Sequence, residues 1–120
     1  MSMIDTVLTG KLERVLDVTT ARQRVIASNM ANVDTPRYRT RDIDFQAELR
    51  RAEASAGSDP VEPVAQEVQG LIERPDGNNV DMDREGMALS ETQLEFRAGI
   101  DLLRSEFKKL SMAINDGRTS

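Results

Sequence analysis

The sequence predicts a mainly α-helical chain in which long N- and C-terminal helices pack as an antiparallel coiled-coil pair. Three observations support this. Apolar residues recur at spacings of three and four near both ends, a proline-containing break follows the first such stretch, and turn-forming residues fill the interval between them. We expect an N-terminal helix over residues 1–33, a loop-rich middle region over 34–80, a C-terminal helix over 81–116 and a tail over 117–120.

The N-terminal helix is predicted from an apolar stripe that is weakest in its middle. The stripe consists of Ile4, Leu8, Leu12, Val15, Ile26 and Met30. It is interrupted between Thr19 and Arg24, where the expected apolar position near Arg22 is polar. The spacing therefore predicts an amphipathic helix with a polar interruption on its buried face.

The middle region combines short elements with turns. Alternation in R-Y-R-T-R-D-I-D-F predicts an extended stretch, residues 45–54 a short helix, and residues 68–73 a short strand. The small, polar, proline-containing residues 55–64 have the composition of a linker. In the turn R-P-D-G-N-N, Gly77 can accept a positive φ.

The C-terminal helix has the clearest periodicity of the chain. Its heptad seam consists of Leu89, Phe96, Ile100, Leu103, Phe107, Leu110 and Ile114, with one polar member, Gln93. Asp81 is a candidate N-cap, and residues 115–117 supply a predicted stop. Periodicity leaves open whether the seam is the core of a small bundle or a contact with other subunits, and the two are compatible.

Composition argues against several classes of function. The 120 residues carry 16 basic and 21 acidic side chains, so the net charge of −5 disfavours a binder of nucleic acid or anionic membranes. With no His and no Cys, the chain lacks the commonest general base and thiolate chemistry. We predict no catalytic residue, no metal ligand and no cofactor. The N-terminus lacks the features of a cleavable secretory signal, and no stretch is apolar enough to span a membrane.

Three local patterns imitate functional sites and are better explained structurally. The basic stretch R-Y-R-T-R is followed at once by Asp42 and Asp44, which favours a solvated or subunit-facing loop over a nucleic-acid groove. D-G-N-N-V-D-M-D-R-E lacks the ligand, glycine and glutamate positions of a calcium loop, so a turn and a helix cap explain it. The two aspartates have no nucleophile beside them and are interpreted as a polar strand face.

The break after the first helix resembles the signature of the bacterial flagellar rod and hook family, whose usual form ends in Pro-Gly-Tyr. In this chain the sequence of the break is A-N-V-D-T-P-R-Y. R-D-I-D-F-Q-A-E-L and R-P-D-G-N-N-V-D-M-D-R-E are also similar to segments of rod proteins, and the three lie in order along most of the chain. The residues that carry the motif are Ala31, Asn32, Val33, Asp34, Thr35, Pro36 and Tyr38, with Arg37 where the family usually has Gly.

The resemblance implies a structural subunit of the proximal rod of the flagellar basal body, assembling helically to transmit torque across the periplasm. It also implies type III export without a cleaved signal. The implied partners are other copies of the chain, neighbouring rod proteins and the export-gate adaptor. Two alternatives are a soluble helical chaperone or adaptor of a secretion system and, less favoured, a small carboxylate enzyme.

Within this interpretation, the break is expected to fix the corner between the first helix and the middle region. Asn32 is expected to end the helix in the left-handed conformation, and Pro36 to keep Thr35 out of the helical region. Arg37 is expected to favour a type I turn or an extended exit over the type II turn that Pro-Gly would form. The polar interruption between Thr19 and Arg24 is expected to contact another subunit.

Overall fold

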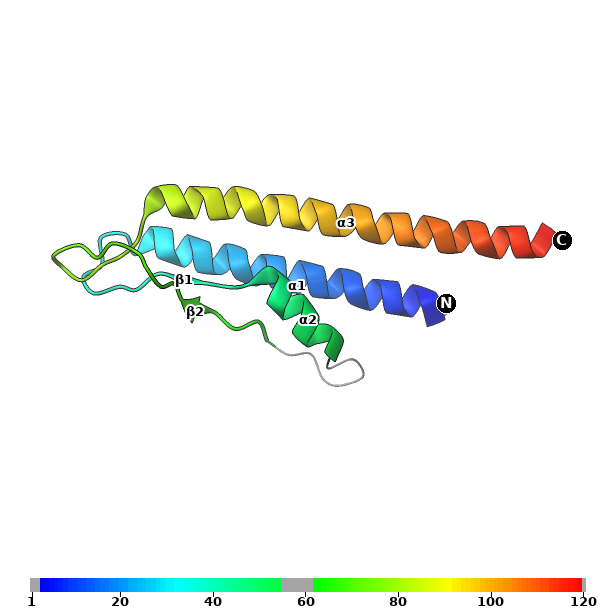
Figure 1. Ribbon diagram of the computed structural model, residues 1–120, viewed down its shortest axis with the longest axis horizontal. Coiled ribbons are helices and arrows are strands. Elements are labelled where there is room, and N and C mark those ends of the chain that lie inside the picture. Colours follow the sequence, from blue (N-terminus) through cyan, green and yellow to red (C-terminus); the bar gives the residue numbers. More distant parts are fainter. Residues whose placement is uncertain (1–2, 55–61, 120) are drawn as a thin grey trace.

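Two long antiparallel helices form the frame of the molecule (Figure 1). The computed structural model describes residues 3–54 and 62–119, without the side chains of residues 4, 5, 118 and 119. Helix α1 spans Met3–Ala31, and helix α3 spans Met82–Thr119. They pack side by side in a body of 71 × 28 × 20 Å, and α3 continues past the N-terminal end of α1 (Figure 1). The predicted mainly helical class, with the terminal helices packed together, is confirmed.

The middle region lies along α1 and carries three short elements: β1 (Arg41–Asp42), α2 (Phe45–Ala54) and β2 (Gln66–Glu67). The short helix has the predicted bounds. The two strands are antiparallel, with Arg41 opposite Glu67. The strand predicted over residues 68–73 was wrong, because pairing ends where the Val68 amide donates to the Thr40 carbonyl at 3.0 Å and Gly70, with φ 83°, then turns the chain away. Residues 55–61 of the predicted linker lie outside the described residues.

The ends of α3 differ in how they are formed. At its start, the Asp81 carboxylate accepts hydrogen bonds from the amides of Asp83 (3.0 Å) and Arg84 (3.3 Å), which is the geometry of an N-cap. The predicted end at residue 116 was wrong, because the helix continues to Thr119. Gly117 does not have the positive φ of a helix stop. An internal Gly costs about 1 kcal/mol against Ala, which is too little to end a helix by itself.

The buried apolar residues gather in the half of the molecule nearer the loops. Val15, Val18 and Ile26 supply them from α1, Ala88 from α3, and Ile43 and Val80 from the segments beside the helices. The helices pack tightly at Gly99, where an added Cβ would lie 3.0 Å from a methyl carbon of Val15. A glycine here therefore sets the separation of the two helices.

Candidate functional site

The turn that follows α1 is the first part of the site, and it corrects two expectations. Asn32 does not adopt a positive φ; its side-chain amide donates instead to the Ser28 carbonyl at 2.8 Å, within the last turn of the helix. Arg37, at φ 65°, is the residue in the left-handed region. The Tyr38 amide donates to the Thr35 carbonyl at 3.2 Å and closes a turn across Pro36 and Arg37. A positive φ at the third residue of such a turn defines type II, so the turn is type II although an arginine occupies that position.

A second turn, from Arg74 to Gly77, packs directly against the first. The Gly77 amide closes it on the Arg74 carbonyl at 2.9 Å, and Gly77 has the predicted positive φ, 86°. The Arg37 amide donates to the Asp76 carbonyl at 2.9 Å. An added Cβ on Gly77 would lie 3.3 Å from the Arg37 Cα and 3.1 Å from its Cγ, so only glycine lets the two turns approach this closely.

Two buried asparagines, Asn78 and Asn79, bind the turns together. The Asn78 side-chain amide donates to the carbonyls of Asn32 (2.9 Å) and Thr35 (2.8 Å), 46 and 43 residues earlier in the chain. The Asn79 side-chain oxygen accepts from the Thr40 amide at 2.7 Å. These bonds satisfy polar backbone groups of both loops. The bond from Thr40 to Asn79 is buried, and the two bonds from Asn78 are partly buried.

Asn29, fully buried in α1, connects this corner to both helices. Its amide nitrogen donates to the Arg41 carbonyl (2.7 Å) and to the Glu85 carboxylate (3.0 Å). Its oxygen accepts from the Tyr38 hydroxyl at 3.0 Å and from the Arg41 amide at 3.2 Å. Every hydrogen-bonding group of the Asn29 side chain is therefore used, and Asn29 joins α1, the first loop and α3. We define the polar corner as Asn29, Asn32, Thr35, Tyr38, Asn78, Asn79 and Glu85.

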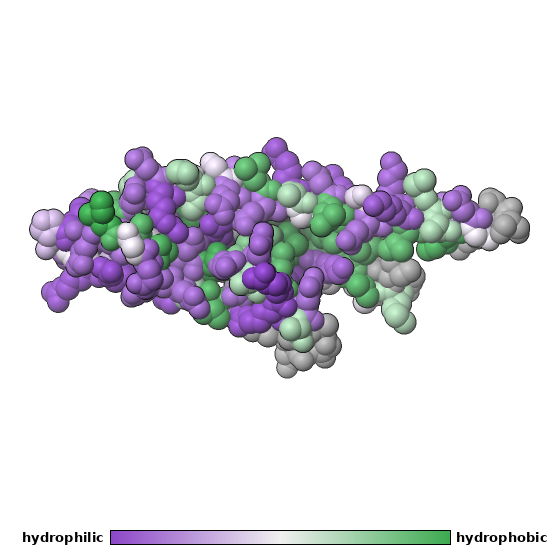
Figure 2. Space-filling view, viewed as in Figure 1, coloured by the Kyte–Doolittle hydropathy of each residue, from purple (hydrophilic) through white to green (hydrophobic). Residues whose placement is uncertain are grey.

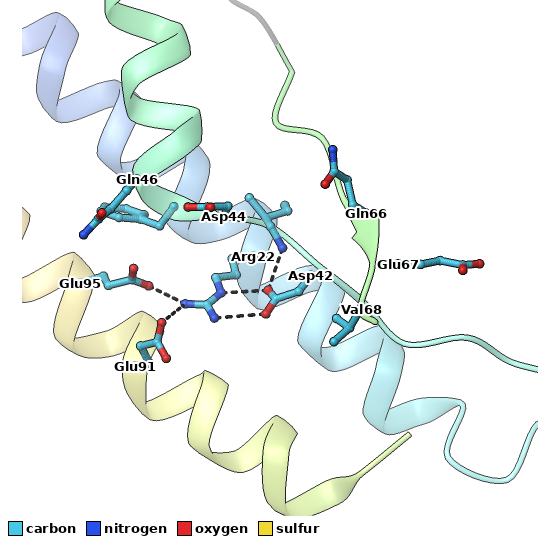
Figure 3. A pocket seen from close by; sticks show the side chains of 11 residues that line it. Arg22, Asp42, Asp44, Gln46, Gln66, Glu67, Val68, Glu91 and Glu95 are labelled. Atoms are coloured by element: carbon cyan, nitrogen blue, oxygen red, sulfur yellow. Dashed lines mark hydrogen bonds and ion pairs between the residues drawn. The ribbon is translucent and has the colours of Figure 1, made fainter. Parts of the chain in front are cut away.

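A cluster of ion pairs lies beside the polar corner, toward the middle of α1 (Figure 3). The buried Arg22 guanidinium binds Asp42 through two nitrogens, at 3.0 and 3.2 Å. A third nitrogen lies 3.2 Å from Glu91 and 2.5 Å from Glu95, both on α3. Arg84 reaches the other side of Asp42 at 2.9 Å. The polar interruption of the stripe was expected to contact another subunit. For Arg22 this expectation was wrong, because the residue is only 6% exposed and its guanidinium binds carboxylates of its own chain.

Charges within this cluster shift three pKa values. Burial acts to lower the pKa of Arg22, but hydrogen bonds to Asp42 and the nearby carboxylates outweigh it and raise the pKa. Burial acts to raise the pKa of Asp42, yet hydrogen bonds from Arg22 and Arg84 hold that pKa below its usual range. The pKa of Glu95 is raised, first by burial and then by the charges of Glu91 and Asp42, against the attraction of Arg22. Asp42 and Arg22 therefore form the charged centre that joins the middle region to both helices.

The cluster forms one wall of a cleft of about 430 Å³. Asp44, Gln46 and Glu67 also line it (Figure 3), together with Phe45. Within the described residues, no group of three or more carboxylates is arranged to hold a metal ion. None of the described residues that line the cleft carries a hydroxyl or amine nucleophile. Its charged wall is the cluster that joins the middle region to both helices.

The remaining predicted residues are distributed as follows. In the motif, Ala31, Asp34, Thr35 and Pro36 are exposed, and Asn32, Val33 and Tyr38 are half-buried. In the N-terminal stripe, Val15 and Ile26 are buried, Leu8, Leu12 and Met30 are half-buried, and the side chain of Ile4 lies outside the described residues. In the heptad seam, Leu89, Phe96, Ile100, Leu103 and Leu110 are half-buried, while Phe107 and Ile114 are exposed.

In the first half of α3, the most closely packed positions lie one residue before the heptad seam. The buried Ala88 and Thr92 and the tightly packed Gly99 precede seam positions 89, 93 and 100. These smaller residues let the helix axes approach, so the larger seam residues flank the contact instead of filling it. Phe107 and Ile114, the two seam residues nearest the C-terminus, remain exposed.

Sequence reasoning missed the residues that organise the site: Asn29, Asn78, Asn79 and Glu85. Asn29 had one detectable signal, because it lies three residues after Ile26 and thus on the buried face of the helix. Glu85 and the two loop asparagines had none, because their partners are far away in the sequence.

Comparison of the sequence with known proteins identifies the family to which the chain belongs. A family model described as "Flagella basal body rod protein" matches residues 16–39, which include Arg22, Asn29 and the first turn. The flagellar basal body rod protein FlgB of Salmonella typhimurium is 30% identical, over 88% of this chain and 91% of its own length. FlgB of Escherichia coli is 32% identical over the same shares, and FlgB of Borrelia hermsii is 31% identical over 84% and 90%. The chain belongs to the FlgB family of flagellar basal body rod proteins.

Proposed function

We propose that this chain builds the proximal segment of the rod by packing its two long helices against other copies and against neighbouring rod proteins, while the polar corner fixes where the middle region lies. The chain is a structural subunit of the flagellar basal body rod. The family is a structural one, and no observation favours the chaperone alternative. What the proposal adds is which part of the chain does which task.

The main support is the exposure of apolar side chains toward the chain termini. Phe107, Met112 and Ile114 on α3 are 51, 56 and 45% exposed, and Met3 and Val7 on α1 are 82 and 53% exposed. Figure 2 shows apolar surface between the two long helices in this half of the molecule. We call the part formed by residues 3–14 and 100–117 the free end. Exposed apolar side chains that gather on one part of a surface are typical of protein interfaces.

The form of the assembly follows from the shape of the subunit. The polar corner and the free end are different surfaces at opposite ends of an elongated molecule, so contacts between them are heterologous and need not close into a ring. Such contacts build the helical rod through which we propose torque is transmitted across the periplasm. The proposed partners at its two ends are another rod protein and the export-gate adaptor.

The proposed route to the rod is type III export without a cleaved signal. No helix in the described residues is long and apolar enough to cross a membrane. We propose that the chain reaches its site by passage through the export apparatus and is then retained by packing of its helices.

The experiment that tests the proposal is quantification of the chain in basal bodies purified from its source organism, for the wild type and two variants. Ile114→Glu places a charge on the seam, and Asn115→Glu places the same charge on the adjacent exposed residue. We expect a few stoichiometric wild-type copies per particle, a reduction of about tenfold for Ile114→Glu, and no change for Asn115→Glu. Wild-type chain that is missing from the particles and recovered in the cytoplasm beside a client would contradict the proposal.

A further inference from the structure

Arg37 combines a strained backbone with a side chain that forms no polar contact with the described part of the chain. Its φ of 65° lies in the left-handed region, which L residues other than Asn and Asp rarely adopt. Glycine would adopt this conformation without strain. The arginine side chain therefore makes the monomer less stable than a glycine would.

The surrounding structure holds this strain in place. The Arg37 amide is bound to the Asp76 carbonyl, the Tyr38 amide closes the turn, and the Arg37 Cα and Cγ lie against Gly77. The backbone at this position is thus fixed by both turns. None of these three contacts involves the guanidinium group.

The other arginines of the two loops all bind within the molecule. Arg39 lies 3.5 Å from the Glu73 carboxylate, Arg41 donates to the Ala65 carbonyl at 2.9 Å, and Arg74 donates to the Val80 carbonyl at 2.9 Å. Arg37 is exposed, and among the residues that the structure describes none accepts a hydrogen bond from its guanidinium. Arg37 thus adds backbone strain to the fold, and its guanidinium forms no polar contact with the described residues in return.

We infer that the Arg37 guanidinium is an intersubunit contact that binds a carboxylate on the protein surface of the adjoining rod subunit. The loop that carries Arg37 closes the end of the molecule opposite the chain termini (Figure 1), where an axial neighbour would meet it. A guanidinium binds a carboxylate through two parallel hydrogen bonds, which fixes orientation as well as distance. This inference rests on the proposed function, because it needs a neighbouring subunit.

The charges around Arg37 are of both signs, which favours a single carboxylate on a protein over an anionic membrane. Asp34 and Asp76 are exposed on the same two loops, and Glu73 is paired with Arg39 at 3.5 Å. A uniformly anionic membrane would meet these carboxylates together with the guanidinium, whereas a single carboxylate on a protein can face the guanidinium alone.

The test separates the stability of the monomer from its assembly. Arg37→Gly removes both the strain and the guanidinium, so we expect the melting temperature of the purified chain to rise by about 3 °C. In basal bodies of a strain that carries only this variant, we expect about tenfold fewer copies of the chain than in wild type. Arg37→Glu keeps the strain, reverses the charge and should lower incorporation further with little change in melting temperature.

Two controls define the role of the side chain. Arg37→Lys retains the positive charge and should retain part of the incorporation, because an ammonium binds a carboxylate without the paired geometry. Arg50→Glu reverses an exposed arginine on α2 and should leave incorporation unchanged.

Each contrary result has a distinct meaning. A more stable Arg37→Gly variant that still assembles at the wild-type level would overturn the inference while leaving the proposed function intact. Wild-type chain absent from the basal bodies would overturn the proposed function. Binding of the wild type, but not of Arg37→Gly, to vesicles of anionic phosphatidylglycerol would overturn the inference in favour of a lipid contact.

Discussion

The polar corner and the free end are built from the same two helices, yet they are stabilised in opposite ways. Among the described side chains, every buried residue of α1 lies from Val15 onward, and every buried residue of α3 lies no later than Thr92. The corner is closed by hydrogen bonds between segments far apart in the sequence. The free end has periodic apolar residues and leaves them half-buried or exposed.

The difference shows which half of the chain can be completed by folding alone. Buried polar groups need hydrogen-bond partners, and the seven side chains of the polar corner find theirs within a single chain. Apolar residues that a single neighbouring helix covers only in part need another surface to bury them. We therefore expect mutations at the corner to lower the stability of the monomer, and mutations at the free end to affect assembly first.

The largest effect is expected from Asn29→Ala. The change leaves the Arg41 amide and carbonyl, the Tyr38 hydroxyl and one Glu85 oxygen without their Asn29 partner, and should lower the free energy of unfolding by about 4 kcal/mol. Urea denaturation followed by circular dichroism measures it. Asn115→Ala, at an exposed position of the free end, should stay within about 0.5 kcal/mol of wild type. Equal losses at the two asparagines would abolish the distinction between the ends.

A matched pair of isoleucines sharpens the comparison for apolar residues. Ile26 is 1% exposed and Ile114 is 45% exposed. We expect Ile26→Ala to cost about 3 kcal/mol through lost burial and a residual cavity, and Ile114→Ala to cost less than about 1 kcal/mol in the isolated chain. Denaturation of both variants gives the two values. A cost at Ile114 close to that at Ile26 would mean that the free end is already packed in the monomer.

Two glycines with similar backbone angles test the contact between the turns. Gly70→Ala should lower the free energy of unfolding by about 1 kcal/mol through the positive φ alone, because nothing lies within 4 Å of the added Cβ. Gly77→Ala introduces the same strain, and its added Cβ also crowds Arg37, so we expect the free energy of unfolding to fall by about 2 kcal/mol. The thermal unfolding midpoints of the two variants provide the comparison. Identical losses would show that the turns can separate without cost.

The smallest effect concerns pH. The pKa of Asp42 is lowered in the folded chain, so the unfolded chain binds the proton more readily, and the stability from Asp42 is present at neutral pH and lost as pH falls below about 4. Glu95 acts in the opposite sense: its raised pKa favours the folded state in acid, and this contribution is lost as pH rises. Urea midpoints between pH 3 and 7 should fall toward acid in wild type and fall less in Asp42→Asn. A variant with the same acid dependence as wild type would exclude Asp42 as its source.

Predictions from the sequence succeeded where the signal was local. The helix over residues 45–54, the positive φ of Gly77 and the mainly helical class depend on neighbours within a few residues, and all three are confirmed. The strand at 68–73 and the end of α3 at 116 were wrong, since pairing partners and packing decide such boundaries. Arg37 was expected to avoid the left-handed region by its own preference. The second turn, 40 residues away, holds it there.

The sequence by itself determined the two amphipathic helices, the break between them and the family, because periodicity and short motifs are properties of adjacent residues. Only the tertiary structure decided which polar residues are buried. Arg22 and Asn29 interrupt or border an apolar stripe, and nothing near them in the sequence indicates that Asp42, Glu85 or Glu95 will meet them. A buried polar group is tolerated only when it forms hydrogen bonds or ion pairs within the fold. The partners of Arg22 named above, Asp42 and Glu95, lie 20 and 73 residues away along the chain.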